Sequence, residues 1–177
     1  GYLKRKSVLL VTLRSTDRTA WKKLFVELGV GLSNFHNASS VKDAQTLIDT
    51  QKIDIVFTSY YIDNHPAIEI LESHISKYPD RSNHFCFFVS DKNSMVLAAL
   101  IAELQVNALI LKPYNQEILL NVVKESMLGA IDMNKEIQEF HSIMGDIRLE
   151  RFEEALEASN SLIEERPDGA SGYYLKG

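Results

Sequence analysis

The sequence predicts an α/β protein: a doubly wound sheet of five parallel strands, followed by a C-terminal α-helical hairpin. Short apolar runs alternate with helical patterns along residues 7–128, which is typical of βαβ units. The runs at 53–57 and 85–89 are almost continuously apolar, as expected for strands that are buried on both faces of a parallel sheet. Right-handed crossovers then produce the doubly wound arrangement.

The first half of the pattern contains three strands and two helices. Trp21, Leu24 and Phe25 recur at helical spacing and predict the first helix. Gly29 marks its end, and the candidates for its N-cap are Ser15, Thr16 and Asp17. The predicted elements, in order, are a strand at 7–12, a helix at 17–28, a strand at 32–35, a helix at 41–51 and a strand at 53–58.

The second half continues the alternation. The predicted elements are a helix at 67–77, a strand at 85–89, a helix at 95–104, a strand at 108–111 and a helix from about Gln116 that is capped by Asn115. Phe57 and Phe87 are expected to be buried in central strands. Cys86 is the only cysteine, cannot form an intramolecular disulfide, and is expected to pack as a small apolar side chain.

Composition excludes several classes of protein. Hydrophobic residues make up 45% and charged residues 24% of the 177 residues, which is typical of a soluble globular chain. The net charge of −5 argues against nucleic acid or an anionic membrane as the partner. No apolar run approaches the roughly 18 residues of a membrane span, and no signal peptide is visible, so a cytoplasmic location is expected.

Ligand chemistry in such a sheet belongs at the carboxyl ends of the strands. Those ends carry Thr12, Leu13, Ser59, Ser90 and Lys112. The three hydroxyl groups could line a small pocket, although such groups more often satisfy loose backbone atoms at strand ends. Lys112 could bind an anion near Ser59, but we favour a lysine that hydrogen-bonds to neighbouring hydroxyl or carbonyl groups.

Residues 4–128 resemble the receiver domain of response regulators, which have the flavodoxin-like fold. The segment Leu111-Lys112-Pro113-Tyr114 is similar to the Lys-Pro-aromatic motif after the fifth strand of that family. Glu69-Ile70-Leu71 matches an acidic-apolar pair in the third helix, and Ser90 stands where the family has Ser or Thr. The resemblance implies a place in bacterial-type, two-component signal transduction.

Several residues of the family's phosphorylation site are replaced. Ser59 occupies the position of the phospho-accepting aspartate. Thr12 and Leu13 occupy the positions of the acidic pair that helps to hold a divalent cation, and a leucine cannot coordinate Mg²⁺. Leu109 replaces the aromatic switch residue. The degenerate site therefore predicts a pseudo-receiver with no catalytic residue, no metal and no cofactor.

Three alternatives remain open for this site. Asp17, Asp63 and Asp91 could rebuild a metal site, although Asp17 is better explained as a first-turn carboxylate that interacts favourably with the helix dipole. A phosphorylation-dependent regulator could use Ser59 or Asp63 as a non-standard acceptor, with Lys112 reading the added charge. A nucleotide sensor is a third possibility, but no Gly-rich phosphate loop supports it. The five histidines show no metal-ligand spacing.

After Met127 the sequence pattern is helical only, so we place a domain boundary between 1–128 and 129–177. A helix is predicted at 132–147. Phe152, Ala155 and Pro167 resemble the aromatic, alanine and closing proline of a tetratricopeptide repeat. Residues 170–177 resemble the start of a further repeat, which implies a longer repeat array. A plain helical hairpin packed on the receiver-like domain is the alternative.

The combined expectation is a non-catalytic adaptor that acts by protein–protein interaction. A protein partner would bind through the tetratricopeptide-like helices or through the receiver face, since helical arrays present concave binding surfaces. A homodimer is a further possibility, formed through either of these two surfaces. No membrane and no nucleic acid are expected as partners.

Overall fold

The structure is a computed structural model of the chain. It describes residues 2–79, 83–92, 97, 99, 106–148 and 150–167. The chain divides into two compact units, residues 1–128 and 129–177, and each is described by itself. The predicted helix at 95–104 lies almost wholly outside the described residues, and so does the segment 168–177.

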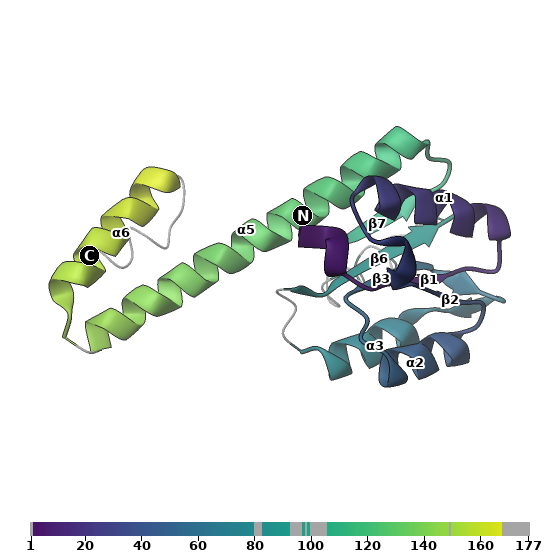
Figure 1. The fold of residues 1–177 in the computed structure, drawn as a ribbon, viewed down its shortest axis with the longest axis horizontal. Coiled ribbons are helices and arrows are strands. Elements are labelled where there is room, and N and C mark those ends of the chain that lie inside the picture. Colours follow the sequence, from purple (N-terminus) through teal and green to yellow (C-terminus); the bar gives the residue numbers. More distant parts are fainter. Residues whose placement is uncertain are drawn as a thin grey trace. The chain divides into compact units, whose positions relative to one another are not determined.

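Five parallel strands form the central sheet of the first unit, in the order β2-β1-β3-β6-β7 (Figure 1). The strands are β1 (Val8–Val11), β2 (Phe35–Ala38), β3 (Ile55–Ser59), β6 (Phe85–Ser90) and β7 (Ala108–Leu111). Phe57 of β3 pairs in register with Leu10 on one side and with Phe87 on the other. The predicted five-stranded parallel sheet is therefore confirmed.

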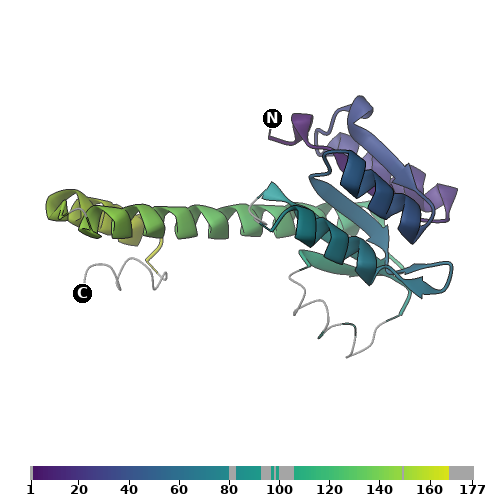
Figure 2. The ribbon, with the colours of Figure 1, turned by 90° about the horizontal axis from the view of Figure 1, so that it is seen from below.

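Helices cover both faces of this sheet. Figure 1 shows α1 and the first part of α5 on one face, and α2 and α3 on the other. Figure 2 shows α2 and α3 lying next to each other on the same face of the sheet. Asn115 caps α5 as predicted, because its Oδ1 atom accepts a hydrogen bond from the backbone N of Ile118 at 2.8 Å. The helices are α1 (Ser15–Glu27), α2 (Val41–Thr50), α3 (Ile68–Lys77) and α5 (Gln116–Arg148).

The core has an aromatic layer under α1 and a mainly aliphatic layer, which also contains Tyr60 and Phe88, under α2 and α3. The ring centroid of Phe57 lies 4.9 Å from that of Trp21 and 5.3 Å from that of Phe25, both in edge-on contacts. Phe57 and Phe87 are fully buried, as predicted. On the other face Cys86 is buried in an apolar cluster with residues of α2 and α3, which confirms its predicted role as a small apolar side chain.

Two local predictions were wrong. The strand predicted at 32–35 begins only at Phe35, which pairs with Val8. Residues Leu32–Asn34 instead form a 3-10 turn, η2, closed by a hydrogen bond from the N of Asn34 to the O of Gly31. The helix α1 starts two residues earlier than predicted, so Ser15, Thr16 and Asp17 lie in its first turn and none of them is the N-cap. The N-cap is Arg14, whose side chain makes no capping hydrogen bond.

A two-stranded hairpin that was not predicted follows β3. It consists of β4 (Tyr61–Ile62) and β5 (His65–Pro66), which pair antiparallel. Asp63 and Asn64 at its tip both have positive φ, 48° and 62°, which is the conformation of a type I′ turn. Asp and Asn are among the residues that tolerate this region, so the Asp63-Asn64 pair was the signal that could have found the hairpin.

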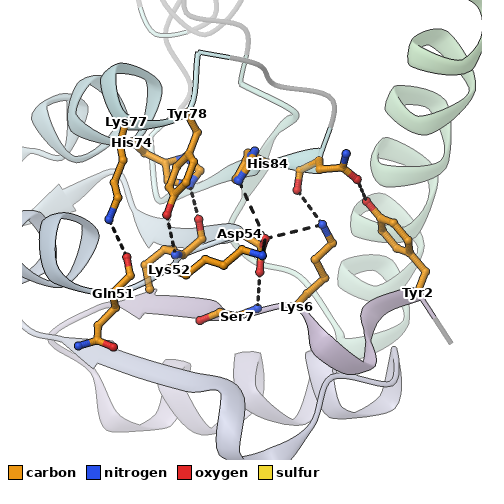
Figure 3. A network of polar contacts seen from close by, with 12 residues as sticks. Tyr2, Lys6, Ser7, Gln51, Lys52, Asp54, His74, Lys77, Tyr78 and His84 are labelled. Atoms are coloured by element: carbon orange, nitrogen blue, oxygen red, sulfur yellow. Dashed lines mark hydrogen bonds and ion pairs between the residues drawn. The ribbon is translucent and has the colours of Figure 1, made fainter. Parts of the chain in front are cut away.

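The amino ends of the strands meet around a buried carboxylate, Asp54 (Figure 3). Its Oδ2 atom accepts a hydrogen bond from the N of Ser7 at 2.9 Å. Its Oδ1 atom faces the Nζ atoms of Lys6 and Lys52, each at 3.7 Å, and Nε2 of His84 at 4.0 Å. Burial lowers the pKa of Lys6, and the charge of Asp54 works against that shift. A buried charge is tolerated only when it is paired, so these contacts stabilise the amino edge of the sheet.

The second unit contains the end of α5 and helix α6 (Phe152–Glu165). The helix predicted at 132–147 is not separate, because α5 continues unbroken to Arg148. Between the helices, Glu150 has a φ of 59° and Arg151 pairs with Asp146 at 2.7 Å. Ile143, Ala155 and Leu162 form a small buried cluster. None of the helices described is long and apolar enough to cross a membrane.

Candidate functional site at the carboxyl ends of the strands

The five residues predicted from the sequence come together at the carboxyl edge of the sheet. A hollow of about 120 Å³ lies there, and Asp17, Tyr61 and Asp91 contribute to its wall. The sheet topology explains the grouping, because parallel strands end at one edge and β1, β3, β6 and β7 are neighbours. The predicted residues that line the hollow are Thr12, Leu13, Ser59, Ser90 and Lys112.

Ser59 ends β3 and is bonded to another hydroxyl group. Its Oγ atom donates to Oγ1 of Thr12 at 3.3 Å, and the same Oγ1 accepts from the N of Arg14 at 3.2 Å. A serine becomes a strong nucleophile only beside a general base. Among the described residues that line the hollow there is no histidine, and the partner of Ser59 is a threonine.

Ser90 is engaged by its own loop. Its Oγ atom donates to the O of Lys92 at 2.9 Å and accepts from the N of Lys92 at 3.1 Å. These bonds close a turn after β6 and direct the hydroxyl group toward the backbone. This is the backbone-satisfying role that the sequence favoured for the strand-end hydroxyls.

Lys112 is paired with carboxylates. Its Nζ atom lies 2.6 Å from Oδ2 of Asp17 and 3.8 Å from Oδ1 of Asp91. Our expectation that Lys112 bonds neighbouring hydroxyl or carbonyl groups is therefore wrong. Asp17 lies in the first turn of α1, as predicted, but its carboxylate also reaches across to Lys112. The 2.6 Å contact is a short charge-assisted hydrogen bond.

The remaining candidate residues do not add a carboxylate to the paired Asp17 and Asp91. Leu13 is 56% exposed, in the position where the resemblance places a carboxylate. Asp63 lines a different hollow beside the β4–β5 hairpin, so it does not join Asp17 and Asp91 in one group. Among the described residues, no three His, Cys, Asp or Glu side chains converge in a way that could hold a metal ion. Leu109 packs against the apolar cluster under α2 and α3.

One contact near the site was missed by the sequence analysis. Nε1 of Trp21 in α1 donates to the hydroxyl oxygen of Tyr114 at 2.7 Å, across 93 residues of sequence. Burial raises the pKa of Tyr114, and the bond from Trp21 works against that shift. The aromatic residue of the Lys-Pro-aromatic motif was visible in the sequence, but its partner in α1 was not.

The first unit is similar in fold to solved structures of receiver domains. The chain is 17% identical to a CheY-like response regulator receiver domain protein from Methanospirillum hungatei JF-1, with a TM-score of 0.59, covering 72% of this chain and 98% of that one. It is 15% identical to the chemotaxis response regulator CheY4 of Vibrio cholerae, with a TM-score of 0.57 and coverage of 68% and 98%. For the non-phosphorylated HemR receiver domain from Leptospira biflexa, identity is 15%, the TM-score is 0.60 and coverage is 70% and 94%.

These similarities define the class: the first unit has the flavodoxin-like fold of a response-regulator receiver domain. The receiver fold predicted from the sequence is confirmed. No protein-family model matches the sequence, and neither does any curated protein. At these identities the likeness is one of fold, and function has to be argued from the site.

Proposed function

We propose that the protein is a non-catalytic pseudo-receiver, an adaptor that acts in two-component-type signal transduction by protein–protein interaction. One observation carries the proposal. The residues at the carboxyl edge offer no carboxylate at the positions of Leu13 and Ser59, and the nearby carboxylate of Asp17 is already paired with Lys112. Phosphoryl transfer to a receiver needs a nucleophile and a bound cation, and both depend on carboxylates at this edge.

Electrostatics support the proposal. Mg²⁺ prefers carboxylate and carbonyl oxygens in octahedral geometry. A cation placed at this edge would have to displace the ammonium group of Lys112 from Asp17, which it contacts at 2.6 Å. We therefore expect no Mg²⁺ binding tighter than about 1 mM.

The test is incubation with acetyl phosphate and Mg²⁺, followed by intact-mass measurement. The expected result is a chain whose mass does not change. Gain of one phosphoryl group by the natural sequence would overturn the proposal. The matched variant is Leu13→Asp combined with Ser59→Asp, which returns two carboxylates to the edge. Acquisition of an acid-labile adduct by this variant alone would assign the inactivity to those two positions.

The alternative is a phosphorylation-dependent regulator with Ser59 or Asp63 as acceptor. Lys112 lies in the same hollow as Ser59, which favours Ser59 over Asp63 if a phosphoryl group is accepted at all. Asp63 sits at the hairpin tip in the left-handed conformation and lines the other hollow. Peptide mapping of any adduct found in the same experiment decides between them.

We further propose that residues 129–177 begin a tetratricopeptide repeat. Ala155, at the alanine position of the repeat, is buried with Leu162 of α6 and Ile143 of α5, which supports the proposal, although Ile143 stands where the repeat has a small residue. Phe152, the aromatic position of that pattern, is 61% exposed. We propose that the partner is a protein that binds through these helices or through the receiver face, and that the protein works in the cytoplasm. A homodimer is the other possible assembly, and light scattering tests for it. A single monomeric mass across micromolar concentrations would exclude the dimer.

A further inference from the structure

Lys112 stands between two carboxylates that belong to different elements. Its backbone is fixed, because its N donates to the O of Ser90 at 2.9 Å. Its Nζ atom makes the 2.6 Å contact with Asp17 of α1 and the 3.8 Å contact with Asp91, which follows β6. The side chain of Asp17 is 16% exposed, whereas that of Asp91 is 71% exposed. The ammonium group is hydrogen-bonded to Asp17 and lies only within ion-pair distance of Asp91, so a movement of the flexible Lys112 side chain would reverse which carboxylate holds the hydrogen bond.

A second tie joins α1 to the same segment one helical turn further on. Asp17 and Trp21 are four residues apart and so lie on one face of α1. Trp21 is fully buried and bonded to Tyr114, two residues after Lys112. The segment 112–114 is therefore held to α1 at both ends.

That segment leads directly into α5. Asn115 provides the first cap of α5, and the N of Leu119 donates to the O of Asn115 at 3.1 Å. Leu119 and Val123 are fully buried and fix the first turns of the helix to the first unit. The position of the α5 start thus depends on the segment 112–114 that α1 holds.

We propose that Lys112 is a two-position latch between α1 and the loop after β6. In the first position its ammonium group bonds to Asp17, and the Trp21–Tyr114 bond and the start of α5 are held in place. In the second position the ammonium group pairs with Asp91, α1 loses one of its two ties, and the start of α5 loosens. A ligand or partner that binds one of the two carboxylates shifts the balance, because it binds one position in preference to the other. The latch goes beyond the proposed function and does not depend on whether the protein accepts a phosphoryl group.

Trp21 is the only tryptophan, so the whole chain has a single indole N–H signal in an NMR spectrum. The experiment measures hydrogen exchange of this indole proton and of the backbone amides of residues 119–123 in the full chain. Asp17→Asn removes the first position and should accelerate both. An acceleration of at least about fivefold corresponds to a coupling of about 1 kcal/mol between the two ties.

Asp91→Asn removes the second position and should leave both exchange rates unchanged or slower. Tyr114→Phe removes the second tie directly and gives the upper reference for the indole proton. The control is Asp43→Asn, since Asp43 is an exposed first-turn carboxylate of α2 for which the described part of the chain shows no ion pair. It reports the loss of a favourable helix-dipole charge alone. Exchange in β1 and β3 reports any global loss of stability.

Opposite behaviour of the Asp17 and Asp91 variants supports the latch. Equal acceleration by Asp17→Asn and Asp91→Asn would overturn it, because Lys112 would then be held by both carboxylates at once. Acceleration by Asp17→Asn no greater than that by Asp43→Asn would overturn it too, since the two ties would then be independent. The acetyl phosphate experiment measures a change in mass, so its outcome is independent of these exchange rates and tests the proposed function alone.

Discussion

Replacement of Asp54 by alanine should destabilise the first unit more than any other removal of an acidic side chain at its amino edge. The carboxylate is buried and accepts the 2.9 Å bond from the N of Ser7. A hydrogen bond to a charged group contributes about 1.5–3 kcal/mol. Removal of the carboxylate also leaves Lys6, whose side chain is 13% exposed, without its nearest opposite charge. Breaking a buried pair costs about 3–5 kcal/mol. Lys6 is partly exposed and the side chain of Lys52 is 76% exposed, so the expected loss lies near the lower end, about 3 kcal/mol.

The assay is equilibrium urea unfolding of the full chain at pH 7, followed through Trp21 fluorescence. Asp54→Asn keeps the shape and one acceptor oxygen but loses the charge, so it should lose less than Asp54→Ala. The control is Asp49→Ala, because Asp49 is an exposed acidic residue at the end of α2. It should change the free energy of unfolding by about 0.5 kcal/mol or less. A loss for Asp54→Ala within 1 kcal/mol of the Asp49 control would refute the view that this carboxylate organises the edge.

Three further outcomes are expected. Phe57→Ala and Phe87→Ala should each lower the free energy of unfolding by about 3–5 kcal/mol, and Ser59→Ala by no more than about 1 kcal/mol; denaturant melts in the reverse order would contradict the placement of the strands. Gly29→Ala should be destabilising by about 1 kcal/mol because Gly29 has a φ of 98°, whereas Gly129→Ala inside α5 should be stabilising by a similar amount, and equal signs would be incompatible with these conformations. Burial is the larger cause and the neighbouring Tyr61 the smaller cause of a raised pKa of Tyr60, above the ordinary value of 10.0. The contribution of Tyr60 to the free energy of unfolding is therefore fully present below pH 10.0 and is lost as the pH rises through the folded-state pKa. The stability of the natural chain relative to Tyr60→Phe should therefore fall above pH 10.0 in pH-dependent melts, and parallel curves would show that Tyr60 does not contribute.

Local pattern was sufficient for most of the fold. Apolar runs predicted β3, β6 and β7, and helical spacing predicted α1, α2 and α3, because burial on both faces of a sheet leaves a direct mark on the sequence. The β2 strand was misplaced because Phe35–Ala38 is short and half polar, so its periodicity is weak. The start of α1 was misplaced because Ser, Thr and Asp are favourable both as caps and in a first turn.

The candidate site also has features that local sequence predicts and contacts that it does not. The sequence alone identified which residues line the hollow, since strand ends are predictable once the strands are. It did not identify the pairing of Lys112 with Asp17 or of Trp21 with Tyr114, because these contacts span 95 and 93 residues and depend on the packing of α1 on the sheet. Asp54 did leave a signal: a lone carboxylate inside an apolar run is expected to need a buried partner.

The pairing of Lys112 has a kinetic consequence for any partner that docks at the carboxyl edge. Both neighbouring carboxylates already face the ammonium group, at 2.6 and 3.8 Å, and Arg14 also lines the hollow, so two positive and two negative charges largely cancel there. A cancelled field does not attract a charged molecule from a distance, and association then proceeds at about 10⁵–10⁶ M⁻¹s⁻¹ instead of the faster, electrostatically steered rates. Encounters at this edge should therefore be almost insensitive to ionic strength, and selection among partners would depend on how long each one stays bound.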